Sequence, residues 1–173
     1  EQVKYNDYIL KSADEIQHYL KMLMDMIKSE DTLVLKSVRI ETKVFFQKLV
    51  EQEKALASEK NLELINEQDK IPEFFYGDEE FLYRAIMNVI TNAVEYSPKK
   101  GRLLFKVQGT EKSLQFLIAD SGSGFSKEEL ESATEQFYLG DKSRNSKNHY
   151  GIGLSITKSF IKLHQGEIEL SNS

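Results

Sequence analysis

The chain has 173 residues, of which 40% are hydrophobic and 29% are charged, a composition typical of a folded globular protein with a real core. Its net charge of −5 argues against a general nucleic-acid-binding protein, because that function needs a basic surface. The absence of cysteine excludes disulfides and thiolate zinc sites, and no apolar run approaches the roughly 20 residues of a membrane-spanning helix.

The first thirty residues carry apolar side chains at spacings of three and four, as at Tyr5, Ile9, Ile16 and Leu23. This pattern predicts one long amphipathic helix. Its apolar seam either packs on the domain C-terminal to it or joins a bundle or coiled coil with a second copy of the chain. The polar run KSED (residues 28–31) separates the seam from the rest of the chain and favours the second arrangement.

From Thr32 onward strands and helices mix. Asp78 is a good N-cap for a helix that is predicted to end at about Glu95. The segments RLLFKVQG and SLQFLIAD alternate apolar and polar residues, as strands do, and Ser126 with Glu129 forms a capping box. The predicted strands are Thr32–Val38, Asn61–Ile65, Arg102–Gly109, Ser113–Asp120 and Glu167–Leu170; the predicted helices are Glu41 to about Ser58, Asp78 to about Glu95, a short one after Ser126, and Gly151 to about His164.

The polar segment from Gly140 to Tyr150 is expected to be irregular. Because there is no regular alternation of strand and helix, we expect an α+β fold. Its architecture would be a two-layer sandwich, a mixed sheet with helices on one face, preceded by the long amphipathic helix.

Three clusters carry candidate chemistry, and the first is a pair of asparagines. Asn88 and Asn92 lie one turn apart on the predicted helix, with Glu95 and Tyr96 on the same polar side. A neutral amide oxygen suits a hard cation such as Mg²⁺ that is already surrounded by phosphate oxygens. Helix capping or a solvated helix face is the structural alternative.

The second cluster follows the strand that ends at Asp120. Its sequence, DSGSGF, combines a carboxylate at a strand end with Gly122 and Gly124, where a flat ligand can approach the backbone closely. The carboxylate can accept a hydrogen bond from an exocyclic amine such as that of adenine. Taken alone, this segment could equally be a turn.

The third cluster, YGIGL, opens the last predicted helix. Gly151 and Gly153 allow backbone N–H groups and the positive helix N-terminus to meet a phosphate. The segment before it holds Lys142, Arg144 and Lys147, an excess of positive charge suited to gathering a polyphosphate. A solvated loop explains either piece alone but not all three clusters in this order.

The order NVITNAVEYSP, DSGSGF, FYLGDKSR, YGIGLSI resembles the N, G1, F and G2 boxes of the catalytic ATP-binding domain of sensor histidine kinases. These belong to the ATPase superfamily shared with gyrase, the large chaperones and mismatch-repair proteins. Four ordered boxes are far more specific than a lone glycine motif. The resemblance implies that residues 32–173 are the catalytic domain, with its closing strand truncated. It also implies that residues 1–31 are the second helix of a dimerisation and phosphoacceptor module.

The same resemblance implies roles for individual residues. Asn92 is expected to hold the Mg²⁺ that bridges the ATP phosphates, with Asn88 beside it, while Tyr96 lies against the adenine and Asp120 binds its amine. Asn88, Lys142 and Arg144 are the expected catalytic residues. The further expected nucleotide-binding residues are Gly122, Gly124 and Phe125 at the adenine pocket, Tyr138, Lys142 and Arg144 in a lid, and Gly151, Gly153 and Leu154 at the phosphate-facing helix start.

Asn88 also distinguishes the expected reaction from hydrolysis. In the superfamily's hydrolytic members a glutamate at the matching position activates water, whereas an amide cannot accept that proton. The resemblance therefore implies transfer of the γ-phosphate to a histidine on a helix outside this chain, followed by relay to an aspartate of a response regulator. The other implied properties are a homodimer formed through the N-terminal helix, a cytoplasmic domain, and attachment to the plasma membrane only through other parts of the protein.

Two substitutions depart from the family pattern. Glu95 stands where the family usually has lysine, and Leu139 where it usually has arginine, so two cations that neutralise phosphate charge are missing. Lys142 or Arg144 can substitute for them. The alternative hypothesis is a degenerate module that binds nucleotide or docks a partner without chemistry. None of the three histidines, His18, His149 and His164, stands in the family's acceptor motif.

Overall fold

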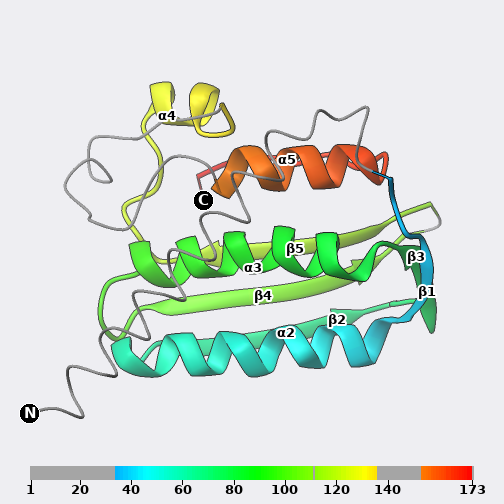
Figure 1. Ribbon diagram of the computed structural model, residues 1–173. Coiled ribbons are helices and arrows are strands. Elements are labelled where there is room, and N and C mark those ends of the chain that lie inside the picture. Colours follow the sequence, from blue (N-terminus) through cyan, green and yellow to red (C-terminus); the bar gives the residue numbers. More distant parts are fainter. Residues whose placement is uncertain (1–33, 111, 136–152, 173) are drawn as a thin grey trace, which may run out of the picture. The chain divides into compact units, whose positions relative to one another are not determined.

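A computed structural model describes residues 34–110, 112–135 and 153–172 of the chain (Figure 1). The chain divides into two units, Glu1–Val34 and Leu35–Ser173, and the second contains nearly all the described residues. The helix predicted in residues 1–31 and the irregular segment predicted at 140–150 lie outside the described residues. Among the helices that are described, none is both long and apolar enough to cross a bilayer.

Three strands form the main sheet of the second unit. β4 (Arg102–Gly109) lies in the centre, with β2 (Glu63–Asp69) parallel to it on one side and β5 (Leu114–Asp120) antiparallel on the other. A separate pair, β1 (Val38–Glu41) and β3 (Phe74–Gly77), forms a small antiparallel sheet. The prediction of a mixed sheet is therefore confirmed.

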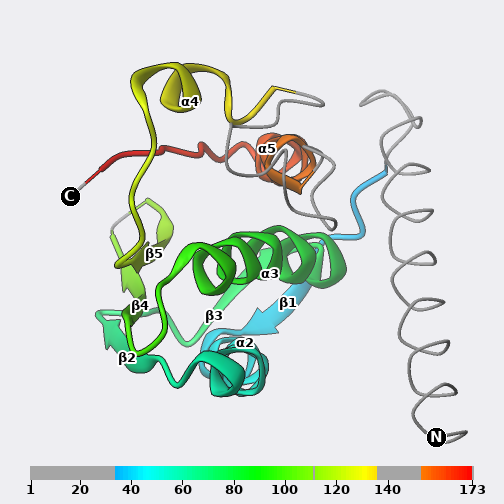
Figure 2. The same cartoon turned by 90° about the vertical axis from the view of Figure 1, so that its left-hand side faces the viewer.

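Helices cover one face of the main sheet. Figures 1 and 2 show α2 (Thr42–Ala57) and α3 (Glu79–Tyr96) side by side on this face, with α5 (Gly153–Leu163) next to α3. A short helix, α4 (Lys127–Ser132), follows β5 and begins with the predicted Ser126–Glu129 capping box. The α+β sandwich with helices on one face is as expected.

The core lies between this helical layer and the sheet. Every second residue of β4 faces the helices, and Leu103, Phe105 and Val107 are completely buried there. Above them, Leu49 of α2 and Ile90 of α3 are also completely buried. Each such side chain contributes roughly 1.5–3 kcal/mol through removal of apolar surface from water, so this contact between layers fixes α3 on the sheet.

Most predicted elements are confirmed, and those confirmed follow local signals. α2 and α3 begin and end within one residue of the predicted limits, and β4 matches its prediction at both ends. α5 ends one residue before His164, and the Asp78 carboxylate accepts the Phe81 N–H at 3.1 Å, as an N-cap does.

Three strand predictions are wrong in part or in full. Residues 34–37 of the predicted Thr32–Val38 strand are not in a strand, because β1 pairs only where β3 lies opposite it, from Val38 onward. β2 runs beyond the predicted Asn61–Ile65 through polar residues, since pairing with β4 satisfies its backbone whatever the side chains are. Glu167–Leu170 is not a strand, because no described strand pairs with it.

Candidate functional site

The predicted asparagines lie on α3, on a side that the core leaves partly open. Leu82, Ile86 and Ile90 are buried on the core side of the helix, whereas Asn88 and Asn92 are half-buried. The structure gives the Asn92 side chain no hydrogen bond to any described residue. Its amide oxygen is therefore available to a ligand.

Asn88 joins α3 to the start of α5. Its side-chain Nδ2 donates to the carbonyl oxygen of Gly153 at 3.3 Å, and the same oxygen accepts the Thr157 hydroxyl at 3.0 Å. Thr157 Oγ1 also lies 3.2 Å from the carbonyl oxygen of Ala85. Because Asn88 uses its NH₂ group in this contact, its Oδ1 atom remains for a ligand.

The glycine at the start of α5 has open space beside it. A Cβ built on Gly153 meets no heavy atom within 4 Å, and the next residue, Leu154, is half-buried. The first backbone N–H groups of a helix have no partner within the helix. The room next to Gly153 therefore fits the expected approach of a phosphate to this helix start.

The loop after β5 is held against the other end of α3. Asp120 Oδ1 accepts the Gly122 N–H at 2.7 Å, and the Ser121 hydroxyl oxygen accepts the Arg102 N–H at 2.8 Å. A Cβ on Gly122 would lie 2.5 Å from Asp120 Oδ1 and 2.9 Å from the carbonyl oxygen of Tyr96. Only glycine fits between these groups, and the second oxygen of Asp120 remains for a ligand amine.

Gly124 and Phe125 meet a residue that the sequence did not single out. The Phe125 N–H donates to Asn172 Oδ1 at 2.8 Å, and Asn172 Nδ2 donates to the Phe125 carbonyl at 2.8 Å. Gly124 has a φ of +67°, and a Cβ there would lie 2.6 Å from Asn172 Oδ1. In this structure the space beside Gly124 is therefore filled by Asn172, a contact whose sequence separation of 47 residues left no local signal.

The predicted site thus comes together in part. The contacts of Asn88 with Gly153 and of Tyr96 with Gly122 bring two segments that are far apart in sequence to one helix, α3. Tyr96 and Asp120 are exposed beside this junction. Four predicted residues, Tyr138, Lys142, Arg144 and Gly151, lie outside the described residues, as does Leu139.

The donor set fits a magnesium ion carried by a nucleotide better than a protein-only metal site. Nowhere in residues 34–110, 112–135 and 153–172 do three His, Asp or Glu side chains gather as metal ligands. Asn92 offers one neutral oxygen, and Mg²⁺ is commonly held by one or two protein oxygens together with substrate phosphates. A nucleotide would therefore have to supply the remaining ligands.

Comparison with known proteins agrees with this geometry. Residues 77–173 match the family described as histidine kinase-, DNA gyrase B- and HSP90-like ATPases. The sensor histidine kinase SpaK of Bacillus subtilis is 35% identical over 173 residues, which cover the whole of this chain and 38% of SpaK. The chain therefore spans less than half of that relative.

Two solved structures show the same fold at low sequence identity. Full-length ShkA in complex with AMPPNP matches with a TM-score of 0.72 at 19% identity, over 95% of this chain and 36% of ShkA. The histidine kinase ThkA in complex with the response regulator protein TrrA matches with a TM-score of 0.70 at 16% identity, over 92% of this chain and 44% of that chain.

Proposed function

Because this chain belongs to the family of histidine kinase-, DNA gyrase B- and HSP90-like ATPases, and carries the ATP-binding catalytic domain of a sensor histidine kinase, we propose that the polar side of α3 binds Mg-ATP. The observation that carries the proposal is the double contact of α3. Asn88 bonds to the Gly153 carbonyl at the start of α5, and the Tyr96 carbonyl backs onto Gly122 beside Asp120. A phosphate-binding and an adenine-binding segment would thus meet one helix.

The adenine end is assigned to Asp120 and Tyr96. One carboxylate oxygen of Asp120 is occupied by the Gly122 N–H at 2.7 Å, which fixes the group and leaves the other oxygen to accept the adenine amine. Tyr96, which is exposed at the end of α3 that meets the Gly122 loop, would supply a flat apolar ring for the adenine. Gly122, Gly124 and Phe125 form the backbone of this end of the site.

The phosphate end is assigned to Asn92, Asn88 and the start of α5. Asn92 Oδ1 would ligate Mg²⁺, which neutralises phosphate charge during phosphoryl transfer. Asn88 Oδ1 would lie beside it, and the backbone N–H groups of Gly153 and Leu154 would donate to phosphate oxygens. Tyr138, Lys142, Arg144 and Gly151 complete the proposed site from the part of the chain that the structure does not describe.

The proposed reaction is transfer of the γ-phosphate to a histidine, followed by relay to an aspartate of a response regulator. An asparagine at position 88 cannot remove a proton from water, so the site favours transfer over hydrolysis. We assign residues 1–31 to a dimerisation helix and expect dimers of the chain in solution. A monomeric mass by light scattering would contradict that assignment. We also place the domain in the cytoplasm, with any membrane attachment through other parts of the protein.

Titration with a non-hydrolysable ATP analogue, with and without Mg²⁺, tests the site. Asn92→Ala should remove the Mg²⁺-dependent part of the affinity and leave adenosine binding unchanged, because adenosine carries no phosphate. Asp120→Asn should weaken adenosine and the analogue alike. Asp69→Asn is the matched control, since Asp69 also ends a strand of the same sheet. Unchanged affinity in both site variants would refute the proposal.

Glu95 supports one second candidate, a module that binds nucleotide without chemistry. It is exposed in the last turn of α3, where the family usually has a lysine that would favour phosphate. Incubating a full-length kinase that contains this chain with γ-labelled ATP separates the candidates. Label on histidine supports the kinase, whereas analogue binding without label supports the module.

A further inference from the structure

The end of α3 next to the Asp120 loop is held by a side chain from a distant part of the sequence. Lys60 ends the 3₁₀ turn Ser58–Lys60 that follows α2. Its ammonium donates hydrogen bonds to the carbonyl oxygens of Val94 at 2.9 Å, of Ser97 at 3.0 Å, and of Glu95. A lysine ammonium has three N–H donors, so all of them are used at this helix end.

These carbonyls are groups that a helix cannot satisfy by itself. The last turn of an α-helix leaves its carbonyl oxygens without partners and carries partial negative charge. α3 has no basic residue in its last turn and has Glu95 there, which adds to that charge. Lys60 therefore supplies both the missing donors and the missing positive charge.

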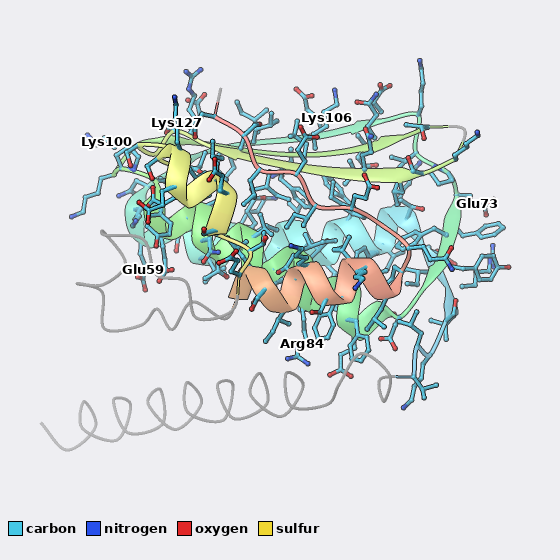
Figure 3. All side chains as sticks on the ribbon, turned by 90° about the horizontal axis from the view of Figure 1, so that it is seen from above. Glu59, Glu73, Arg84, Lys100, Lys106 and Lys127 are labelled. Atoms are coloured by element: carbon cyan, nitrogen blue, oxygen red, sulfur yellow. The ribbon has the colours of Figure 1, made fainter. Side chains whose placement is uncertain are left out.

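The backbone of Lys60 holds the turn that follows the helix. Its carbonyl oxygen accepts the Lys100 N–H at 3.0 Å, and Gly101 in turn donates to the Pro98 carbonyl at 2.9 Å. In Figure 3, Glu59 and Lys100 lie at one end of the described unit and Glu73 at the opposite end. Lys60 thus bonds to residues on both sides of Pro98. These bonds lie at the end of the unit where β5 ends at Asp120.

The carbonyls bound by Lys60 flank Tyr96, whose own carbonyl is the one that backs onto Gly122. Of four consecutive carbonyls, three are therefore bonded by Lys60, and the fourth, that of Tyr96, packs next to Gly122 of the loop after β5. The Tyr96 carbonyl lies so near Gly122 that a Cβ built there would be 2.9 Å from it, so a displaced helix end would change the packing of Tyr96 on the Asp120 loop. The orientation of Tyr96 relative to Asp120 consequently depends on Lys60.

We infer that Lys60 is a positioning residue for the adenine side of the nucleotide site, acting through the end of α3 without contact with the ligand. The inference rests on the proposed function, because it assigns Tyr96 and Asp120 to adenine. A positioning role for Lys60 and a purely electrostatic role predict different effects on ligand binding. Loss of a positive charge near ATP would weaken binding of the phosphates, whereas loss of this cap should weaken binding of adenine even when no phosphate is present.

The test compares adenosine with a non-hydrolysable ATP analogue by calorimetry on the 173-residue chain and its Lys60→Met variant. Methionine keeps a similar stem and removes all three donors. We expect both dissociation constants to rise by the same factor, roughly tenfold. Lys60→Arg, which keeps the charge and part of the donor set, should recover most of the affinity. Lys99→Met is the control, because it removes an exposed lysine from the same turn, and it should change neither constant.

The outcomes separate the inference from the function on which it rests. If the unaltered chain binds neither ligand, the proposed function is wrong and the inference falls with it. If the unaltered chain binds both and Lys60→Met binds adenosine within about twofold of it, only the inference is overturned. A loss confined to the ATP analogue also overturns it, since that result indicates a charge effect.

A measurement on the unaltered chain covers the case in which Lys60→Met does not fold. The ¹⁵N-labelled ammonium of Lys60 should give a slowly exchanging NMR signal, because its three N–H groups are bonded. Saturation with adenosine should shift this signal, and the Lys99 signal should stay unchanged. A Lys60 signal that adenosine does not move would overturn the inference.

Discussion

The two ends of α3 are held by different means. At the first end, Asp78 caps the helix from its own sequence, with its carboxylate accepting the N–H groups of Phe81 at 3.1 Å and Lys36 at 3.0 Å. At the last end, no residue of the helix supplies a counter-charge, and Lys60 provides the cap from 34 residues upstream of Val94. The side-chain cap at the first end is therefore supplied by an adjacent residue, although Asp78 also bonds to Lys36 and His164, whereas the cap beside the proposed adenine site comes from a distant part of the sequence.

This difference indicates which end of α3 can change its position when other parts of the fold change. A local cap forms whenever the helix forms, because its partner is three residues away. A distant cap exists only when α2, its 3₁₀ turn and the end of α3 are all in place. The position of Tyr96 thus depends on α2 and its 3₁₀ turn, whereas the side-chain cap at the start of α3 needs only Asp78.

The largest expected effect on ligand affinity comes from exchanging a glycine at each end. Gly122→Ala would place a Cβ 2.9 Å from the Tyr96 carbonyl oxygen, a backbone atom that can move only with the helix end. We expect adenosine affinity to fall roughly a hundredfold, equivalent to about 2.7 kcal/mol. Gly77→Ala is the counterpart at the first end. Its Cβ would meet the end of the Leu82 side chain at 2.6 Å and the His164 ring at 3.1 Å, both of which are side-chain and not backbone atoms.

Gly77→Ala should therefore lower the melting temperature slightly and leave adenosine affinity unchanged. Calorimetric titration of the two folded variants checks both expectations. Equal losses of affinity would break the comparison, because they would mean that both ends of α3 position the ligand.

The next effect concerns stability and compares the two caps directly. Lys60→Met removes three charge-assisted hydrogen bonds, and we expect the free energy of unfolding to fall by about 3 kcal/mol. Asp78→Ala removes an N-cap and the bond to the Lys36 N–H, for an expected loss of about 2 kcal/mol. Urea unfolding measures both. A smaller loss for Lys60→Met than for Asp78→Ala would show that water replaces most of the hydrogen bonding that Lys60 provides.

The same contrast explains what could be predicted from the sequence. Asp78, the Ser126–Glu129 capping box and the alternation of Arg102–Gly109 act over a few residues, and all three predictions are confirmed. β3 was missed because Pro72 and a short aromatic run look like a connection, and only pairing with β1 makes the segment a strand. The Glu167–Leu170 prediction was wrong for the converse reason, since alternation alone cannot supply a partner strand.

The candidate site shows the same limit. The motifs identified Gly153 and Gly122, two positions that the fold brings to α3, next to Asn88 and Tyr96 respectively. They gave no indication of Lys60, because a lysine at the end of a helix is usually solvated. In the same way, Thr157 and Asn172 make their contacts 72 and 47 residues away. Such contacts are decided by tertiary packing, which a motif does not encode.

A third prediction sharpens the comparison at the first end. His164 Nδ1 lies 2.7 Å from the Phe160 carbonyl and donates to it, so Nε2 is the acceptor for the Asp78 N–H at 2.9 Å. His164→Leu would leave that half-buried N–H without a partner and should lower the free energy of unfolding by about 1 kcal/mol. Adenosine affinity should not change, since this contact lies at the end of α3 opposite Tyr96.

His164→Gln, whose side-chain oxygen can accept the same bond, should recover part of the stability. Thermal melts and adenosine titrations of the two variants provide the measurement. A clear loss of adenosine affinity in His164→Leu would place the first end of α3 in the binding machinery as well.

The smallest expected effect is a gain in stability on replacing Glu53. The same replacement removes a pH dependence of stability that would complicate the comparison of the two caps. Glu53 of α2 is completely buried, and neither carboxyl oxygen has a hydrogen-bond partner of ordinary geometry among the described residues. Burial raises the pKa of the Glu53 carboxyl, while the neighbouring Asn66 amide and the charge of Lys54 act in the opposite direction. The folded protein therefore keeps this proton to higher pH than the unfolded chain does.

The direction of the effect on stability comes from that difference. Below the pKa of the unfolded chain, Glu53 is protonated in both states and adds no pH-dependent cost to folding. As the pH rises from there to the higher pKa of the folded state, the unfolded chain releases its proton first and stability falls.

Glu53→Gln cannot titrate, so it should be more stable by about 1 kcal/mol near neutral pH and show little gain near pH 4. Urea unfolding across this range measures the gain, and Glu51→Gln, exposed on the same helix, is the control. A gain that is equal at both ends of the range would mean that the pKa of Glu53 is the same in the folded and unfolded chain. Otherwise, the caps are best compared in the Glu53→Gln background, where this carboxyl no longer contributes to the pH profile.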